Sequence, residues 1–207
     1  MKIKKLNLKI LLIFGLLFFM TGCMFEVESP PPHDTSCCAD ILKYEELVYP
    51  IEKFTLLETP PSPDYGKFIN NTIVLDFDAS SEEQVYLTVQ MPYSRIKNTT
   101  IYPHFHWTYR EPKAVGDVVW CIEYTCSDVN SYYDYTETTC IADTALDPYQ
   151  HHRTNFMEIN NTFDDSNICI MRLYRDASNQ EDDFPVDAAF LEFDIGYYTY
   201  DYGEEIE

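Results

Sequence analysis

Alternation of apolar and polar residues, repeated in one segment after another, is the feature that most constrains how this chain can fold. Successive side chains of a β-strand point to opposite faces, so an alternating segment has one face suited to burial. After residue 70 no segment shows a sustained helical period, and turn-rich stretches separate the alternating ones. The alternating segments are 72–78, 84–91, 99–110, 117–126, 167–175 and 187–200. Short strands with turns between them predict an all-β fold, an antiparallel β-sandwich or jelly roll.

The alternation also assigns faces within a segment. In 99–110 it places Phe105, Trp107 and Tyr109 on one face and His104 and His106 on the other. The aromatic face makes the better core, so the two histidines are expected to face solvent, a groove or a partner chain. In 187–200 the residues expected to face the core are Leu191, Phe193, Ile195 and Tyr197.

The N-terminus indicates a targeting signal. Residues 2–9 are basic, and the apolar run 10–20 is short for a permanent membrane helix. Small residues then precede Cys23, in a pattern that resembles the lipobox of bacterial lipoproteins, whose cysteine is lipidated and becomes the mature N-terminus. An uncleaved signal anchor and plain secretion are the alternatives. Each of these interpretations places the rest of the chain outside the cytoplasm.

These features divide the chain into three parts: a lipoprotein-type signal peptide (1–22), a Pro-rich tether (23–43) and a β-sandwich domain (44–207). The residue after Cys23 is Met24, so the aspartate that retains lipoproteins at the inner membrane is absent. In a host with two membranes the outer one is therefore expected. A short helix is predicted over 39–48, where the tether meets the domain.

Charge excludes several classes of partner. The chain has 35 Asp and Glu against 14 Lys and Arg, which gives a formal net charge of -21. Nucleic-acid binding and electrostatic attachment to anionic lipid both need clustered Lys and Arg, so neither is expected. Membrane attachment is instead expected through lipid on Cys23.

Several short motifs follow one another between residues 44 and 203. They include 44–50 (YEELVYP), 83–92 (EQVYLTVQMP), 101–107 (IYPHFHW), 116–124 (GDVVWCIEY), 172–177 (RLYRDA) and 187–194 (DAAFLEFD). In their order and spacing these motifs resemble a β-sandwich domain of tailed-phage structural proteins, of the tail-fibre, tailspike or head-fibre kind. The resemblance implies a non-enzymatic module with a structural or surface-recognition role.

His104, His106 and Glu111 form the sharpest local pattern for metal binding. Two histidines two residues apart on a strand point the same way and can share an ion, which a carboxylate can join. The pattern resembles half of the cupin signature, and cupins are jelly rolls. However, Asn98 stands where that signature has glycine, and the second cupin motif is missing. We therefore expect no cofactor, with a divalent metal at these three residues as the alternative.

The six cysteines besides Cys23 allow disulfides. An even number outside the cytoplasm permits pairing, but the sequence leaves the partners open. Cys121 and Cys126 lie on opposite faces of one predicted strand, so they are not expected to bond to each other. Cys126 and Cys169 lie on predicted core faces, where packing as small apolar side chains is the alternative. The cysteines besides Cys23 are Cys37, Cys38, Cys121, Cys126, Cys140 and Cys169.

Two clusters of side chains are candidate binding sites. Tyr132, Tyr133 and Tyr135 share one predicted loop, where exposed tyrosines would suit a glycan or protein ligand; strand propensity and sheet packing are the favoured explanation. The acidic run 181–183 with Asp187 is expected to be a solvated loop rather than a calcium site, because no ordered ligand spacing occurs.

The leading prediction is a non-enzymatic, surface-anchored structural or adhesive module, with homo-oligomer formation left open. The alternatives are a glycan-binding module that uses the tyrosines and a cupin-like metal-binding jelly roll.

Overall fold

The computed structural model describes residues 41–63, 68–70, 72–112, 114–160 and 167–201. The predicted signal peptide, Cys23 and almost all of the predicted tether lie outside these residues. Within the described part of the chain, no helix has the length and apolarity needed to cross a membrane. The elements are β1 (Ile41–Pro50), η1 (Ile51–Lys53), β2 (Ser62–Pro63), β3 (Leu75–Phe77), β4 (Glu83–Gln90), β5 (Tyr102–Thr108), β6 (Asp117–Ser127), β7 (Glu137–Thr144), β8 (His152–Arg153), β9 (Ile168–Arg175) and β10 (Ala188–Asp201).

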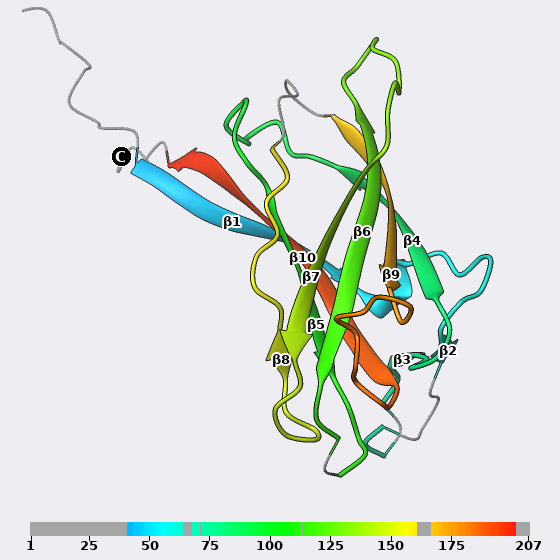
Figure 1. Cartoon of the computed structure of the whole chain (residues 1–207). Helices are drawn as coiled ribbons and strands as arrows, with labels where there is room; N and C mark the ends of the chain where they lie inside the picture. Colours follow the sequence, from blue (N-terminus) through cyan, green and yellow to red (C-terminus); the bar gives the residue numbers. More distant parts are fainter. Residues whose placement is uncertain (1–40, 64–67, 71, 113, 161–166, 202–207) are drawn as a thin grey trace, which may run out of the picture. The chain divides into compact units, whose positions relative to one another are not determined.

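The described strands form two antiparallel sheets, which confirms the predicted all-β sandwich (Figure 1). Sheet A has six strands: β2, β3, β10, β5 and β8 lie in that order, and β1 also pairs with β10. Sheet B has four strands in the order β4, β9, β6 and β7. β10 is the central strand of sheet A, because β5 lies on one side of it and both β1 and β3 pair along the other.

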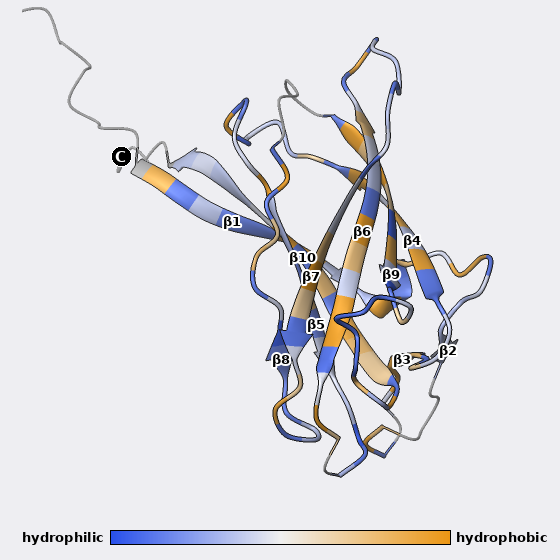
Figure 2. Ribbon diagram, in the orientation of Figure 1, coloured by the Kyte–Doolittle hydropathy of each residue, from blue (hydrophilic) through white to orange (hydrophobic). Residues whose placement is uncertain are grey.

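Aromatic side chains from both sheets form the core. Phe105 of sheet A stacks on Trp120 of sheet B, with ring centroids 5.0 Å apart. Trp107 and Trp120 are both 0% exposed, and the Trp107 indole Nε1 donates a hydrogen bond to Asp143 Oδ2 at 2.7 Å. This confirms the predicted core face of the segment 99–110. Figure 2 shows both hydrophobic and hydrophilic bands along β6, and most of its side chains are buried on both faces of sheet B.

The prediction of a short helix over 39–48 was wrong for the described residues 41–48, which belong to β1. Every residue of β1 pairs with β10, from Ile41 opposite Asp201 to Pro50 opposite Glu192. Leu47 and Tyr49 pack against the core only partly, and Val48 is exposed. A strand that buries little has a weak alternating signal, so pairing with β10 rather than local preference decides its conformation.

Two other details differ from the predicted strands. β7 was not predicted, since it is an edge strand whose side chains are exposed or half-buried and include no apolar face. In β10 the register against β5 shifts between Phe190 and Glu192, which is a β-bulge. The bulge leaves Leu191 half-buried and places Phe190 in the core beside Phe193, so Leu191 does not belong to the core face.

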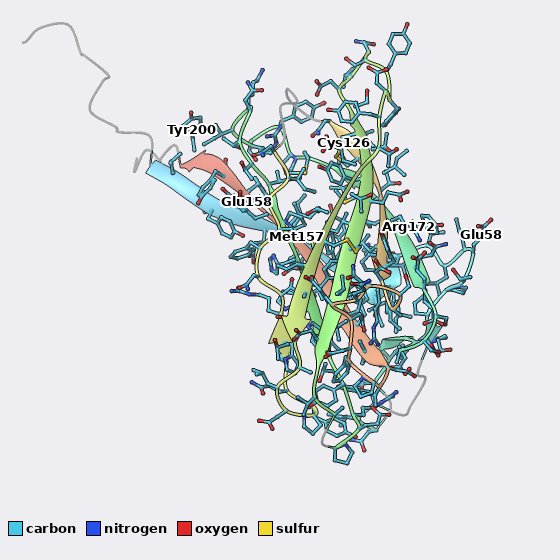
Figure 3. All side chains as sticks on the ribbon, viewed as in Figure 1. Glu58, Cys126, Met157, Glu158, Arg172 and Tyr200 are labelled. Carbon is cyan, nitrogen blue, oxygen red and sulfur yellow. A yellow bond between two sulfur atoms is a disulfide. The ribbon has the colours of Figure 1, made fainter. Side chains whose placement is uncertain are left out.

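Disulfides join β6 to both of its neighbours. Cys121 bonds to Cys140 of β7, and Cys126 bonds to Cys169 of β9. Each pair is directly opposite in the strand register. Cys121 and Cys126 therefore take separate partners, as their opposite faces predicted, and Cys126 and Cys169 are cross-linked rather than packed as free thiols. Figure 3 labels Cys126 on β6.

Candidate functional site

The face of sheet A that points away from the core carries polar and aromatic side chains from neighbouring strands, and we call it the outer face. The alternation that buries Phe105 and Trp107 places their neighbours in β5 on this face. In the register, Asp194 lies opposite His104, and Gly196 lies opposite both Tyr102 and Glu46. The outer face comprises Tyr44 and Glu46 of β1, Tyr102, His104 and His106 of β5, and Glu192, Asp194, Gly196 and Tyr198 of β10.

His104, His106 and Asp194 form the most concentrated polar group of the outer face. Asp194 Oδ2 lies 3.3 Å from His106 Nε2 and 3.7 Å from His104 Nε2. His104 is 1% exposed and Asp194 is 4% exposed. The histidines were expected to face solvent, a groove or a partner chain. His104 is instead buried on the outer face, with the Phe156 ring edge-on to its imidazole at 4.8 Å.

Hydrogen bonds define the orientation of both imidazoles. His104 Nδ1 lies 3.3 Å from the carbonyl oxygen of Tyr102, which can only accept, so Nδ1 carries the proton. His106 Nδ1 lies 2.6 Å from Nε2 of His151, in the turn just before β8, so one of these two nitrogens donates to the other. In both His104 and His106 the Nε2 atom is thus turned toward Asp194.

Burial sets the protonation of the groups around this cluster. Desolvation lowers the pKa of His104 and outweighs the opposing effect of the Tyr102 carbonyl, and His106 nearby lowers it further. Desolvation likewise lowers the pKa of His151, with His106 adding to the effect. The pKa of Glu192 is raised, first by desolvation and then by the negative charge of Asp194. The neutral form of His104 and of His151 is therefore favoured.

Aromatic rings lie next to this cluster. Tyr44, Tyr102, Tyr198 and Phe156, the last from the segment after β8, contact one another with centroids 5.7 to 6.5 Å apart. We call these four residues the aromatic cluster. Tyr44 is 38% exposed and Phe156 is 40% exposed, so their rings remain accessible to a ligand.

Gly196 gives the Tyr44 ring room to lie across the sheet. A Cβ atom at residue 196 would lie 1.7 Å from the Tyr44 hydroxyl oxygen, so any larger residue would displace the ring. Burial, followed by the charge of Glu46, raises the pKa of the Tyr44 hydroxyl to about 12. The phenol therefore keeps its proton and can donate a hydrogen bond at neutral pH.

Of the predicted metal ligands, the structure brings His104 and His106 together, but it places Asp194 where Glu111 was expected. Glu111 is exposed in the bend after β5, and the His, Cys, Asp and Glu cluster found in the described residues consists of His104, His106 and Asp194. Asp194 follows His106 by almost ninety residues of sequence. Only the pairing of β10 with β5 brings it close, so no local spacing could indicate it.

The predicted tyrosine loop lies elsewhere. Tyr132, Tyr133 and Tyr135 belong to the connection between β6 and β7 of sheet B, and Tyr132 is 84% exposed. These tyrosines are free to contact a ligand, but the structure does not bring them together with the polar residues of the outer face.

No protein-family model matches this chain, and no curated protein matches it. The resemblance to phage fibre and spike domains therefore stays a prediction beyond the β-sandwich architecture itself. The CBM22-2 xylan-binding domain of a Paenibacillus barcinonensis protein is similar over 75% of this chain and 99% of that domain, with 14% identity and a TM-score of 0.43.

Two other solved structures show similarity. An isomalto-dextranase of Arthrobacter globiformis, complexed with panose, is similar over 72% of this chain, at 10% identity and a TM-score of 0.42. This chain covers 23% of the length of that enzyme. A structure of Desmodium yellow mottle tymovirus is similar over 88% of this chain and 99% of its own, at 11% identity and a TM-score of 0.25. Likenesses at this level carry no information about a ligand or an activity, which have to come from the site itself.

Proposed function

We propose that this domain is a non-enzymatic module that binds carbohydrate on the outer face of sheet A. The observation that supports the proposal is the aromatic cluster, whose partly exposed rings lie beside carboxylates and imidazoles. Sugar rings have apolar C–H faces that stack on aromatic rings, and hydroxyl groups that bond to polar side chains. Aromatic side chains with an apolar body and a polar tip suit such ligands.

Charge narrows the class of glycan. The chain carries a formal net charge of -21, and Glu46, Glu192 and Asp194 lie on the outer face itself. An anionic polysaccharide would be repelled at long range and at contact. The proposed ligand is therefore an uncharged polysaccharide or oligosaccharide.

The tyrosine loop is the competing location for a glycan, and matched substitutions distinguish it from the aromatic cluster. Affinity electrophoresis in gels containing neutral polysaccharides measures binding of the full chain. Tyr44→Ala and Phe156→Ala are each expected to weaken binding about 30-fold, which corresponds to roughly 2 kcal/mol for a central aromatic contact. Tyr132→Ala and Tyr133→Ala serve as controls and are expected to leave binding unchanged. Gly196→Ala should also weaken binding, because the added methyl group displaces the Tyr44 ring although no aromatic residue is removed.

The proposal fails if no neutral polysaccharide in the panel retards the unmodified protein. It also fails if the loop variants lose binding while the variants of the aromatic cluster retain it. That second outcome would transfer the site to the connection between β6 and β7.

We also propose that the domain works outside the cytoplasm, attached to a membrane by lipid on Cys23. The disulfides Cys121–Cys140 and Cys126–Cys169 favour an oxidising compartment. Cells that express the chain and are fed labelled palmitate are expected to incorporate label into it, and Cys23→Ser is expected to abolish incorporation. Absence of label from the unmodified protein would remove the anchor from the proposal.

A further inference from the structure

Beyond carbohydrate binding, we propose that His104, His106 and Asp194 bind a divalent transition-metal ion, with His151 as a positioning residue for His106. The inference is independent of the aromatic cluster and rests on the geometry of the three ligand residues. It differs from the metal site expected from sequence in its carboxylate, which comes from β10 rather than from the bend after β5.

The distances match the requirements of a single ion. One ligand atom from each of the three residues lies within 4.8 Å of the other two. A zinc ion about 2.0–2.2 Å from nitrogen and oxygen ligands requires those ligands to lie somewhat over 3 Å apart. Asp194 Oδ2 is already 3.3 Å from His106 Nε2 and 3.7 Å from His104 Nε2. Small side-chain rotations would therefore complete the site.

The imidazoles are oriented for coordination. His104 Nδ1–H points to the Tyr102 carbonyl, so the lone pair on Nε2 faces Asp194. Metal-bound histidines commonly donate their other ring N–H to a carbonyl or another acceptor, which holds the ring and selects its tautomer. His151 Nε2, 2.6 Å from His106 Nδ1, can accept that hydrogen bond from His106 in the tautomer that protonates Nδ1 of each ring. The proposal assigns this tautomer, which gives both rings the outer hydrogen bonds of metal ligands.

Asp194 supplies the second, independent observation. Its side chain is 6% exposed, and its Oδ1 atom has no hydrogen-bond partner among the described residues. A buried carboxylate oxygen without a donor is costly, and a bound cation would satisfy it. Glu46 Oε1, 3.9 Å from His104 Nε2, adds negative charge and a further oxygen within reach. The cluster therefore attracts a cation.

The chemistry of the ligands favours a transition metal over calcium or magnesium. Ca²⁺ and Mg²⁺ take oxygen ligands, whereas two imidazoles with one carboxylate suit Zn²⁺, Co²⁺ or Fe²⁺. Three protein ligands leave coordination positions open for water or another donor. Zinc and cobalt are the most direct probes, because cobalt bound by imidazole and carboxylate has a visible absorption spectrum.

The test uses the full chain, stripped of metal with a chelator and titrated with Zn²⁺ and Co²⁺. The expected result is one ion per chain with micromolar or tighter affinity, and a visible band on adding Co²⁺. His104→Gln and Asp194→Asn are each expected to weaken zinc binding at least about 100-fold, and His151→Gln about 10- to 100-fold. Glu111→Gln is the matched control, since it removes an exposed carboxylate outside the cluster and is expected to change nothing.

Two results would overturn the inference: failure of the unmodified protein to bind either ion, or binding that survives both His104→Gln and Asp194→Asn. Loss of zinc binding in Glu111→Gln would identify Glu111, in the bend after β5, as the carboxylate ligand in place of Asp194. Circular dichroism of the metal-free variants checks folding. If a buried variant does not fold, His106→Gln at its half-buried position decides in its place. Polysaccharide binding is measured separately with the Tyr44 and Phe156 variants, so the metal proposal and the carbohydrate proposal can each fail without the other.

Discussion

Replacing Asp182 with asparagine is expected to lower the free energy of unfolding by roughly 3–5 kcal/mol, because it leaves a buried arginine without its counter-charge. The side chains of Arg175 and Asp182 are 0% and 1% exposed. Asp182 accepts two hydrogen bonds from the guanidinium, at 2.9 Å from Nε and 2.7 Å from the second terminal nitrogen. It also accepts the backbone N–H of Val119 at 2.9 Å. One carboxylate therefore joins β9, β6 and the loop before β10.

Arg175 extends this network, which explains the size of the expected effect. Its guanidinium donates to the carbonyl oxygens of Phe184 at 2.7 Å and Val186 at 2.8 Å. The loop that follows β9 is thus held by a buried charge rather than by apolar packing alone. Asp182 was expected in a solvated acidic loop, and its burial against Arg175 corrects that expectation.

Urea unfolding monitored by circular dichroism measures the effect of Asp182→Asn. Glu181→Gln is the matched control: the neighbouring side chain is exposed, and its neutralisation is expected to change stability by less than about 0.5 kcal/mol. Equal and small changes in the two variants would show that the Arg175 charge is compensated by the carbonyl groups alone.

Removal of the Cys126–Cys169 disulfide is the second change that is expected to lower the free energy of unfolding strongly. The bonded residues are 43 positions apart, so the bond restricts a long loop in the unfolded chain and is expected to contribute about 4 kcal/mol. The Cys121–Cys140 bond closes 19 positions and is expected to contribute about 3 kcal/mol. The first pair is also buried in the core, where alanine substitutions leave a small void.

The measurement compares Cys126→Ala/Cys169→Ala with Cys121→Ala/Cys140→Ala in denaturant unfolding under non-reducing conditions. Peptide mapping without reduction verifies which disulfide each variant retains. The first double variant is expected to unfold at the lower denaturant concentration. Equal unfolding midpoints for the two double variants, or no loss of stability in either, would contradict a stabilisation that increases with the length of the closed loop.

The strands with one strongly apolar face could be predicted from sequence. In β5 the alternation of Phe105 and Trp107 with His104 and His106 has a single reasonable interpretation, since only the aromatic side can fill a core. The same reasoning identified β4, β6 and β9. It failed for β1 and β7, whose side chains bury too little to produce a pattern, and whose conformation depends on the strand beside them.

The candidate site also has one part that the sequence predicts and another that depends on which strands pair. The sequence by itself determined that His104 and His106 share a face opposite the core, because side-chain direction along a strand is a local property with a period of two. Only the tertiary structure decided that Asp194 completes the cluster, that Phe156 joins Tyr44 beside it, and that Cys126 meets Cys169. These contacts depend on which strands are neighbours and in which register. That choice is made by burying all apolar faces at once, so no single segment contains it.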